Sequence, residues 1–597
     1  MPHVHALTGP SRSSRAARLL ALAAVAAGAV LAAGTPAAQA KTPAPAPAAT
    51  TTTTDDGLAN LAGVDARMSC DDLVGLTLTD VVQDGVVTID TSVLDDSDPD
   101  VQPFCDVRGN IGPGTTSIVM HLPLTGWTQR YVQTGCGGLC GGDSISYPQA
   151  AGCSVVEDGS VATATTNMGH AGPPTAFFGN QQAVLDFAYR GVHVTAVAAE
   201  AIIEMFYGQP AAYSYFTGCS DGGREALMEA QRYPDDFDGI AAGAPANNMA
   251  VQNTIHHAWN VVANQDQNGE FILLADRLPL IHQAVLDACD GIDGLVDGQI
   301  TDPRQCDFDP TSIVCDDLTV CLTPEEAAVV RKLHDGATTE QGQRLEVYGA
   351  HAWGSELEWT LFVPATPTGS SASANFVNGY MQYLAFTNQQ DQSTTYQDLS
   401  FTREGFWNAV QASPYISAMD PDLSDFAGAG SKLLLWHGWN DQHIPVTNTL
   451  DYWNAMQTTM GQKTVDSFAK LYLFPGMAHC GGGDGPNTFD ILTPLMAWVE
   501  SAQAPDAIVA ATDDGSRTRP VFPYPQVARY DGTGSVDDAS NFVAFAPKKG
   551  ATENASDYRW IGERLYSSGY QTQCTVVDGK LVCTTPASQW FAQMTKA

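Results

Sequence analysis

Residues 213–227 read Tyr213-Ser-Tyr-Phe-Thr-Gly-Cys-Ser-Asp-Gly-Gly-Arg-Glu-Ala-Leu227 and contain a G-x-S-x-G motif with Ser220 at its centre. The aromatic and β-branched residues before the motif predict a buried strand, and residues 224–233, which end before a proline, predict a helix. A serine on so sharp a turn has a strained backbone, so small residues must flank it, and its hydroxyl is exposed at the edge of a sheet. The motif therefore predicts a nucleophilic serine.

The sequence on either side of this turn alternates between strand-like and helix-like patterns, which predicts a mostly parallel sheet. A helical pattern covers 183–212, and strand-like runs cover 117–122, 130–134, 161–166, 237–245, 432–438 and 469–476. Residues 247–430 interrupt the alternation, because they are rich in Asn, Gln, Asp, Ser and aromatic residues. We predict the fold class α/β, as an α/β-hydrolase fold with a large lid domain inserted between the sixth and seventh strands. The core would comprise 58–246 and 431–597, and the lid 247–430.

The N-terminal residues have the features of a targeting signal. Three arginines precede an apolar run at 19–33 and a small-residue site that ends at Ala40, which predicts a signal peptide over 1–40. Residues 41–57 are rich in Pro, Ala and Thr and predict a flexible linker. We therefore expect a secreted protein, associated with the cell wall if the linker tethers it there. Thirteen cysteines in an exported chain predict several disulfides and one unpaired thiol.

The net charge of −38 argues against two classes of partner. An acidic surface repels nucleic acid and anionic membranes. After the signal, no segment of about twenty uninterrupted apolar residues occurs. We expect neither a nucleic-acid partner nor a membrane.

Ser220 needs a base and an acid, which in this fold follow it in the order acid, then histidine. Asp441 follows one late strand and His479 follows the next, so both should lie on loops at the sheet edge where Ser220 lies. We predict Ser220, Asp441 and His479 as a catalytic triad.

Other assignments compete with this triad. The base could instead be His443, on the same loop as Asp441, or His437, at the end of a strand, and the acid could be Asp466. The same histidines with Asp441 could also form a metal site, but they lack the ligand spacing of one. A thiol nucleophile at Cys219 is less suitable, because the elbow places Ser220 at its tip.

Two further features adjoin the predicted machinery. Cys219 precedes the serine and Cys480 follows the histidine, so a Ser220–His479 hydrogen bond would bring these cysteines close enough to form a disulfide. The oxyanion of acyl transfer needs backbone N–H donors, for which we predict the amides of Asp221 and Gly137. Gly137 lies in the glycine-rich loop 135–142, which could alternatively be a simple tight turn.

The sequence resembles the tannase and feruloyl esterase family over nearly all of the mature chain. The matching motifs are 135–141, 218–224, 230–239, 244–246, 479–483 and 523–530. The resemblance implies Ser220, Asp441 and His479 as the triad, a disulfide between Cys219 and Cys480, and hydrolysis of an aromatic ester. Ten lid aromatics could stack on such a ring or form lid core: Trp259, Trp353, Trp359, Phe362, Phe376, Tyr380, Tyr383, Phe401, Phe406 and Trp407.

The resemblance also bears on metal binding, and the remaining cysteines predict further disulfides. Asp290, Asp293 and Asp297 are separated by glycines and could be either a turn cluster or ligands of a hard cation. The family implies a structural calcium held by these aspartates and by backbone carbonyls of Leu295 and Gln299, with no organic cofactor. Further predicted pairs are Cys70–Cys105, Cys289–Cys306, Cys315–Cys321 and Cys574–Cys583. The pairing of Cys136, Cys140 and Cys153 is left open.

The sequence as a whole predicts a secreted serine carboxylester hydrolase. The family resemblance implies that its substrate is a small aromatic ester, such as a feruloyl or galloyl ester of plant cell-wall or tannin origin. A catalytically inactive, calcium-stabilised binding module at the cell surface is the alternative.

Overall fold

The structure is a computed structural model that describes residues 53–54, 56–317, 319–547 and 559–584. The predicted signal peptide and most of the predicted linker lie outside these residues. Among the described residues, no helix is both long and apolar enough to cross a bilayer.

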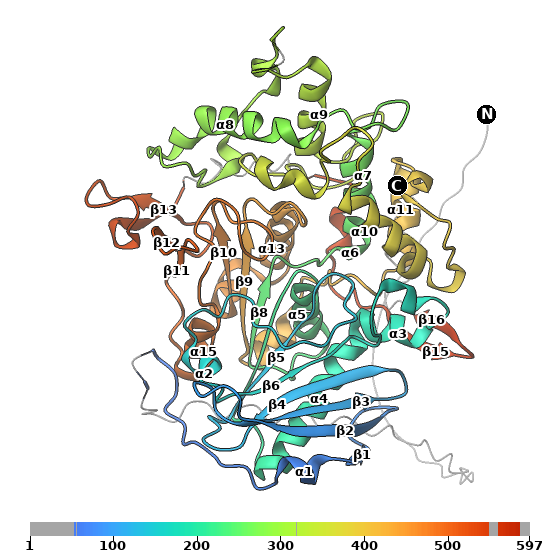
Figure 1. The fold of residues 1–597 in the computed structure, drawn as a ribbon, viewed down its shortest axis with the longest axis vertical. Coiled ribbons are helices and arrows are strands. Elements are labelled where there is room, and N and C mark those ends of the chain that lie inside the picture. The colour runs from blue at the N-terminus through green and yellow to red at the C-terminus, as the bar shows by residue number, and fades with distance from the viewer. Residues whose placement is uncertain (1–52, 55, 318, 548–558, 585–597) are drawn as a thin grey trace, which may run out of the picture. The chain divides into compact units, whose positions relative to one another are not determined.

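A ten-stranded mixed sheet forms the centre of the fold (Figure 1), in the order β1-β2-β3-β4-β6-β5-β7-β8-β9-β10. Neighbouring strands are antiparallel from β1 to β6, and parallel from β6 to β10. The predicted parallel arrangement therefore holds only for the second part of the sheet. The strands are β1 (Thr77–Thr79), β2 (Val86–Asp95), β3 (Phe104–Ile111), β4 (Thr116–Pro123), β5 (Arg130–Thr134), β6 (Ala162–Thr165), β7 (Tyr213–Cys219), β8 (Gly239–Gly243), β9 (Lys432–Gly438) and β10 (Ala469–Phe474).

The central strands are apolar because both of their faces are covered. In β9, Leu433 and Leu435 pack into the core on one face, whereas Leu434 and Trp436 pack into the core on the other. Helices that lie against this sheet are α4 (Gly191–Tyr207), α5 (Asp221–Arg232), α13 (Val446–Met460), α14 (Gln462–Phe468) and α15 (Leu492–Ser501). The helix predicted at 183–212 is observed as α3 (Gln181–Leu185), a π-helical turn, η2 (Asp186–Arg190), and α4.

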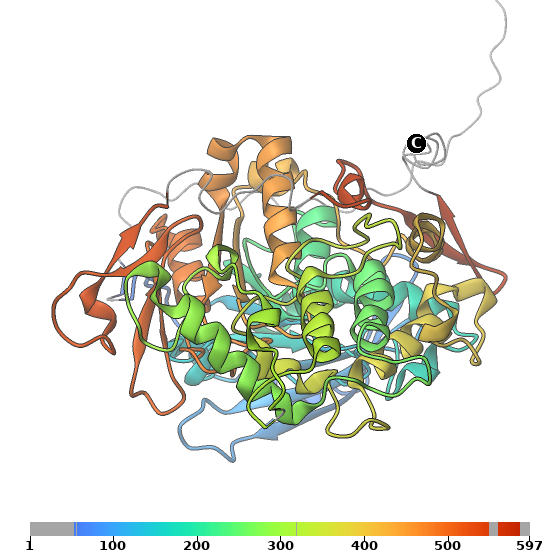
Figure 2. The same ribbon diagram turned by 90° about the horizontal axis from the view of Figure 1, so that it is seen from above.

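The long insertion lies between β8 and β9, which are the sixth and seventh strands when counted from β3. The strands β1 and β2 extend the sheet beyond β3. The described residues of the insertion form helices without a strand of the sheet, and these gather beyond one end of the strands (Figure 1), which they cover when seen from above (Figure 2). The α-helices are α6 (Met249–Val251), α7 (His257–Val262), α8 (Leu278–Cys289), α9 (Pro324–Asp335), α10 (Ala372–Tyr380), α11 (Arg403–Ala412) and α12 (Ser424–Gly428).

The remaining elements are short. Three hairpins follow the main sheet, and two single-turn helices precede or interrupt its first half. These elements are β11 (Ile508–Ala511), β12 (Thr518–Val521), β13 (Val527–Tyr530), β14 (Phe542–Phe545), β15 (Gln573–Val577), β16 (Lys580–Thr584), α1 (Cys70–Leu73) and α2 (Ser154–Glu157).

Candidate active site

Ser220 lies on the turn between β7 and α5, in a backbone conformation that non-glycine residues rarely adopt. Its φ is 66° and its ψ is −120°. A Cβ placed on Gly218 would lie 2.4 Å from the carbonyl oxygen of Gly222, and one on Gly222 would lie 3.0 Å from the carbonyl oxygen of Cys136, so both positions favour glycine. The Ser220 amide donates to the carbonyl of Gly243 at 3.0 Å, and its carbonyl accepts from Ala246. The end of β8 thus holds the strained turn in place.

Asp441 and His479 meet at the same edge of the sheet. His479 Nδ1 lies 2.8 Å from Asp441 Oδ2, while Asp441 Oδ1 accepts from the amides of His443 and Ile444 at 2.7 and 2.8 Å. Burial opposes the charge of Asp441, but His479 and the hydrogen bonds of His437 and His479 outweigh it and lower the pKa of the Asp441 carboxyl. An ionised carboxylate therefore orients the imidazole.

The competing residues occupy different positions. His437 is fully buried behind Asp441, where its Nε2 lies 3.0 Å from Asp441 Oδ2 and its Nδ1 lies 2.9 Å from the Thr449 hydroxyl. His443 packs edge-on against His479, and burial lowers its pKa to about 3. Asp466 is exposed on α14. Among the described residues, the histidines around Asp441 do not form a cluster with metal-ligand geometry.

A disulfide joins the serine turn to the histidine loop. Cys219 and Cys480 are bonded, with their Cα atoms 5.9 Å apart, so the disulfide ties the turn that carries Ser220 to the loop that carries His479. Within the described part of the chain no hydrogen bond reaches the Ser220 hydroxyl. The expected bond to His479 is not formed here, and catalytic hydrogen bonds often tighten only when substrate is bound.

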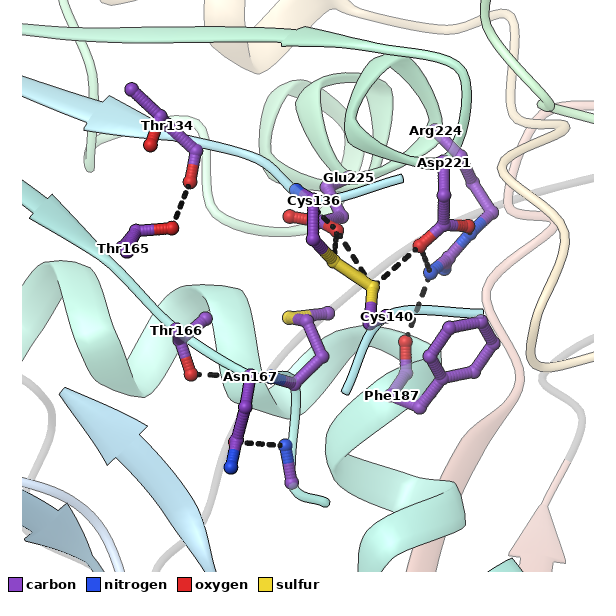
Figure 3. The surroundings of a disulfide bond; sticks show 12 residues. Thr134, Cys136, Cys140, Thr165, Thr166, Asn167, Phe187, Asp221, Arg224 and Glu225 are labelled. Carbon is purple, nitrogen blue, oxygen red and sulfur yellow. Dashed lines mark hydrogen bonds and ion pairs between the residues drawn. A yellow bond between two sulfur atoms is a disulfide. The ribbon is translucent and has the colours of Figure 1, made fainter. Parts of the chain in front are cut away.

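The glycine-rich loop 135–142 packs against the start of α5. A Cβ on Gly135 would lie 2.6 Å from the Cα of Gly222, so the loop and the helix make direct backbone contact. Cys136 and Cys140 form a disulfide across the loop (Figure 3), which resolves the pairing that the sequence left open. Cys153 is the unpaired cysteine of the described residues, and burial raises the pKa of its thiol to about 12.

The two predicted oxyanion donors both lie at this junction. Asp221 is the first residue of α5, and Gly137 lies at the tip of the loop, where a Cβ would meet no atom within 4 Å. Among the described residues, neither amide donates a hydrogen bond to a protein acceptor. These amides are therefore available to a ligand.

The four other predicted disulfides are also present in the structure. They are Cys70–Cys105, Cys289–Cys306, Cys315–Cys321 and Cys574–Cys583.

The aspartate loop 290–299 has the oxygen chemistry that calcium prefers. Asp290 accepts from the amides of Asp297 and Gly298, Asp293 accepts from the amide of Leu295, and Asp297 pairs with Arg519. Burial, and then repulsion by the neighbouring aspartates, raise the pKa of Asp297 despite Arg519. The negative charge of the loop suits a divalent cation, which would compete with Arg519 for Asp297.

Most of the lid aromatics that the sequence singled out are core residues. Trp353, Trp359, Phe362, Tyr380 and Phe406 are almost completely buried. Phe376 differs, because it is only half-buried and its ring lies 4.5 Å from that of His443, which in turn contacts His479. Among the ten aromatic residues singled out in the sequence, Phe376 is thus the one linked to His479 through ring contacts, by way of His443.

Two features of the site could not be found by sequence reasoning. One is the role of His437, which the sequence offered only as a rival base or metal ligand, and which instead contacts Asp441 from the core. The other is Glu225, which lies against the loop 135–142 (Figure 3) but resembles a solvent-exposed helix residue in the sequence. Its only sequence signal is its place one turn after Asp221.

Comparisons with known proteins identify the family of the chain. The family model described as "Tannase and feruloyl esterase" matches residues 105–545. The chain is 34% identical over 464 residues to a probable feruloyl esterase of Arthroderma benhamiae, which spans 71% of this chain and 82% of that protein. It is 30% identical over 518 residues to the mono(2-hydroxyethyl) terephthalate hydrolase of Piscinibacter sakaiensis. This alignment covers 74% of this chain and 85% of that protein.

A solved structure supports the same assignment. The crystal structure of feruloyl esterase B from Aspergillus oryzae superimposes with a TM-score of 0.68 at 27% identity, covering 77% of this chain and 97% of that one. The family match covers most of the chain, and the elbow, aspartate and histidine lie together at one sheet edge. The chain belongs to the tannase and feruloyl esterase family and is a carboxylic ester hydrolase.

Proposed function

We propose that this protein hydrolyses esters of aromatic carboxylic acids through an acyl-enzyme formed on Ser220. The observation that carries the proposal is that the Cys219–Cys480 disulfide joins the Ser220 turn to the loop of His479, whose Nδ1 lies 2.8 Å from Asp441 Oδ2. The Nε2 of His479 is then the atom that is free to accept the serine proton.

The reaction follows from these roles. Ser220 Oγ attacks the ester carbonyl as His479 Nε2 takes its proton, and the oxyanion is bound by the amides of Asp221 and Gly137. The imidazolium returns the proton to the leaving alcohol, so the ester C–O bond breaks and the acyl group stays on Ser220. Water then attacks the acyl-enzyme with His479 as base, which releases the acid and restores the serine.

The aromatic acyl group follows from the relatives of the chain and from ring contacts near His479. Two relatives are named for aromatic substrates, a feruloyl esterase and a hydrolase of a terephthalate monoester. In this chain Phe376 and His443 form an aromatic surface that leads to His479. Stacking on such rings contributes about 0.5–1.5 kcal/mol beyond burial.

Export and calcium belong to the same proposal. Six disulfides among the described residues suit an oxidising compartment. Asp290, Asp293 and Asp297, with the carbonyls of Leu295 and Gln299, would hold a calcium ion that stabilises the lid and takes no part in the chemistry.

The test is an ester panel of methyl ferulate, methyl gallate and mono(2-hydroxyethyl) terephthalate, with ethyl butyrate as the aliphatic reference. We expect turnover of at least one aromatic ester, and a fall in kcat of at least about 10³-fold in Ser220→Ala. Phe376→Ala should raise KM for that aromatic ester more than for ethyl butyrate.

The matched control is Phe401→Ala, which removes a half-buried lid aromatic that packs on Trp259 instead. Equal effects of both phenylalanine variants would refute the role of Phe376. A parent protein that turns over none of the four esters would support the binding module instead of the enzyme.

A further inference from the structure

The loop 135–142 has little regular structure, yet its position decides where the Gly137 amide lies. At its ends, the Gly135 amide donates to Thr217 and the Gly141 amide donates to Asn167. Between these anchors, a Cβ on Gly137 or on Gly138 would meet no neighbour within 4 Å. The tip therefore depends on contacts made by the two cysteines beside it.

Glu225 makes those contacts from the second turn of α5 (Figure 3). Its Oε1 accepts from the Cys136 amide at 3.3 Å and lies 2.8 Å from Cys136 Sγ and 3.5 Å from Cys140 Sγ. The sulfurs carry no hydrogen, because they are bonded to each other. The side chain is 1% exposed, so its carboxyl is committed to the loop and not to solvent.

The second oxygen of Glu225 has no donor in the described residues, which is costly for a buried carboxylate. Protonation removes this cost, because the carboxyl O–H can then donate to Asp221, whose oxygens also bind Arg224 Nε and Nη2 at 2.6 and 3.0 Å. Burial, followed by the charge of Asp221, raises the pKa of Glu225 well above its usual value, while Arg224 opposes the shift. Arg224 binds Asp221 directly, so the neutral acid of the pair is Glu225.

We propose that Glu225 is a positioning residue of the oxyanion site, whose carboxyl joins the Cys136 amide to Asp221 and so sets the Gly137 amide beside the Asp221 amide. The inference rests on the proposed function, because it concerns the oxyanion step of that reaction. Arg224 anchors the arrangement from behind: its guanidinium also donates to the carbonyls of Ala188, Phe187 and Ile416.

Two substitutions separate positioning from simple packing. Glu225→Gln keeps an acceptor for Cys136 and an N–H donor for Asp221, whereas Glu225→Leu fills similar volume with neither. The matched control is Glu229→Leu, one turn further along α5, where an equally buried carboxyl contacts Asp236 and makes no contact with the loop.

With 4-nitrophenyl acetate as the probe, we expect Glu225→Leu to lower kcat by about 10²-fold with little change in KM, as loss of one oxyanion donor does. Glu225→Gln should retain most of the activity. Glu229→Leu should lower the melting temperature without this selective loss of kcat. The affinity of an aryl trifluoromethyl ketone, which forms an oxyanion adduct with Ser220, should fall in parallel with kcat.

A pH profile gives a readout that packing alone would not move. Raising the pH ionises Glu225 in the parent and removes its O–H donor, so kcat should fall on the alkaline side. Asp221, Arg224 and Glu229 face the same carboxyl from its own helix, and the paired cysteines of the loop do not titrate. These groups are common to the parent and Glu225→Gln, so the alkaline fall should be absent from Glu225→Gln alone.

Three results would overturn the inference. They are a Glu225→Leu variant with unchanged kcat, a Glu225→Gln variant as impaired as Glu225→Leu, or identical alkaline limbs in the parent and Glu225→Gln. If Glu225→Leu does not fold, the inference is still tested by Glu225→Gln, through its kcat, its pH profile and its affinity for the ketone. Failure of the proposed function is a separate result, because it would appear as undiminished turnover in Ser220→Ala.

Discussion

Asp441 shows how one carboxylate serves two histidines. Its Oδ2 lies 2.8 Å from His479 Nδ1 and 3.0 Å from His437 Nε2, while its Oδ1 is occupied by backbone amides. His437 lies in the core, whereas the side chain of His479 is 14% exposed. The buried histidine thus restrains the carboxylate from behind, and the accessible one can reach substrate.

Asp441→Asn should leave the fold intact and lower kcat by about 10⁴-fold, because an amide no longer favours the imidazole tautomer that accepts the serine proton. Steady-state kinetics with 4-nitrophenyl acetate would measure the loss. Asp466→Asn is the control, since that exposed aspartate was the rival acid in the sequence and its substitution should change nothing. Comparable losses in both variants would remove Asp441 from the proposed triad.

At the scale of single elements, the loop 290–299 is the clearest case of excess charge. It follows α8, and the disulfide Cys289–Cys306 closes it. Arg517 donates to the carbonyl of Asp297, and Arg519 pairs with its carboxylate, so one hairpin of the C-terminal part offsets some of the charge. A cation would complete this compensation.

Removing calcium with EGTA should lower the melting temperature, and added Ca²⁺ should restore it, because a ligand at one hundred times its Kd stabilises the folded state by about 2.7 kcal/mol. Asp293→Asn should abolish the response. Asp287→Asn removes one exposed charge from the preceding helix and should keep it. If neither EGTA nor added Ca²⁺ changes the melting temperature, the aspartates form a metal-free turn cluster.

At the scale of the whole molecule, the insertion is attached to the sheet beside the histidine loop. His282, on α8, lies 3.2 Å from Glu356 within the insertion and 3.3 Å from Asp484, five residues after His479. Asn440, next to Asp441, donates to Gly354 of the insertion. These contacts couple the position of the insertion to the loops that carry the proposed acid and base.

The His282 attachment should weaken at alkaline pH. Burial opposes its charge, but Asp484 and Glu356 prevail and raise the pKa of His282 to about 9. Because the folded-state pKa exceeds the unfolded value of about 6.5, the stabilisation is fully present below pH 6.5 and is lost as pH rises through about 9. Melting temperatures of the parent and His282→Gln should therefore converge across this window.

Other groups titrate in the same pH range. The effect of His282 is therefore measured as the difference in melting temperature between the parent and His282→Gln. Asp484→Asn removes one partner, which should shift the loss of stability to lower pH. A constant gap between the parent and His282→Gln from pH 6 to 9.5 would contradict the assignment.

The sequence by itself determined the elbow, the strands around it and the positions of the proposed triad. Each depends on local constraints. The turn at Ser220 requires flanking glycines, and central strands that are buried on both faces are continuously apolar. The carboxyl ends of parallel strands lie at the same edge of the sheet, so the loops that follow them meet there. The departure from a mostly parallel sheet arises in the N-terminal strands, where short connections allow antiparallel pairing and strand periodicity carries no information on direction.

Only the tertiary structure decided which side chains from distant segments meet. It paired Cys136 with Cys140, placed His437 behind Asp441, set Glu225 against the loop 135–142 and buried most of the aromatic residues singled out in the insertion. Such contacts depend on packing between segments up to hundreds of residues apart, for which a single sequence holds no periodic signal. The types of reactive side chain could therefore be predicted from local sequence. Their relative positions and the contacts that shift their pKa values could not.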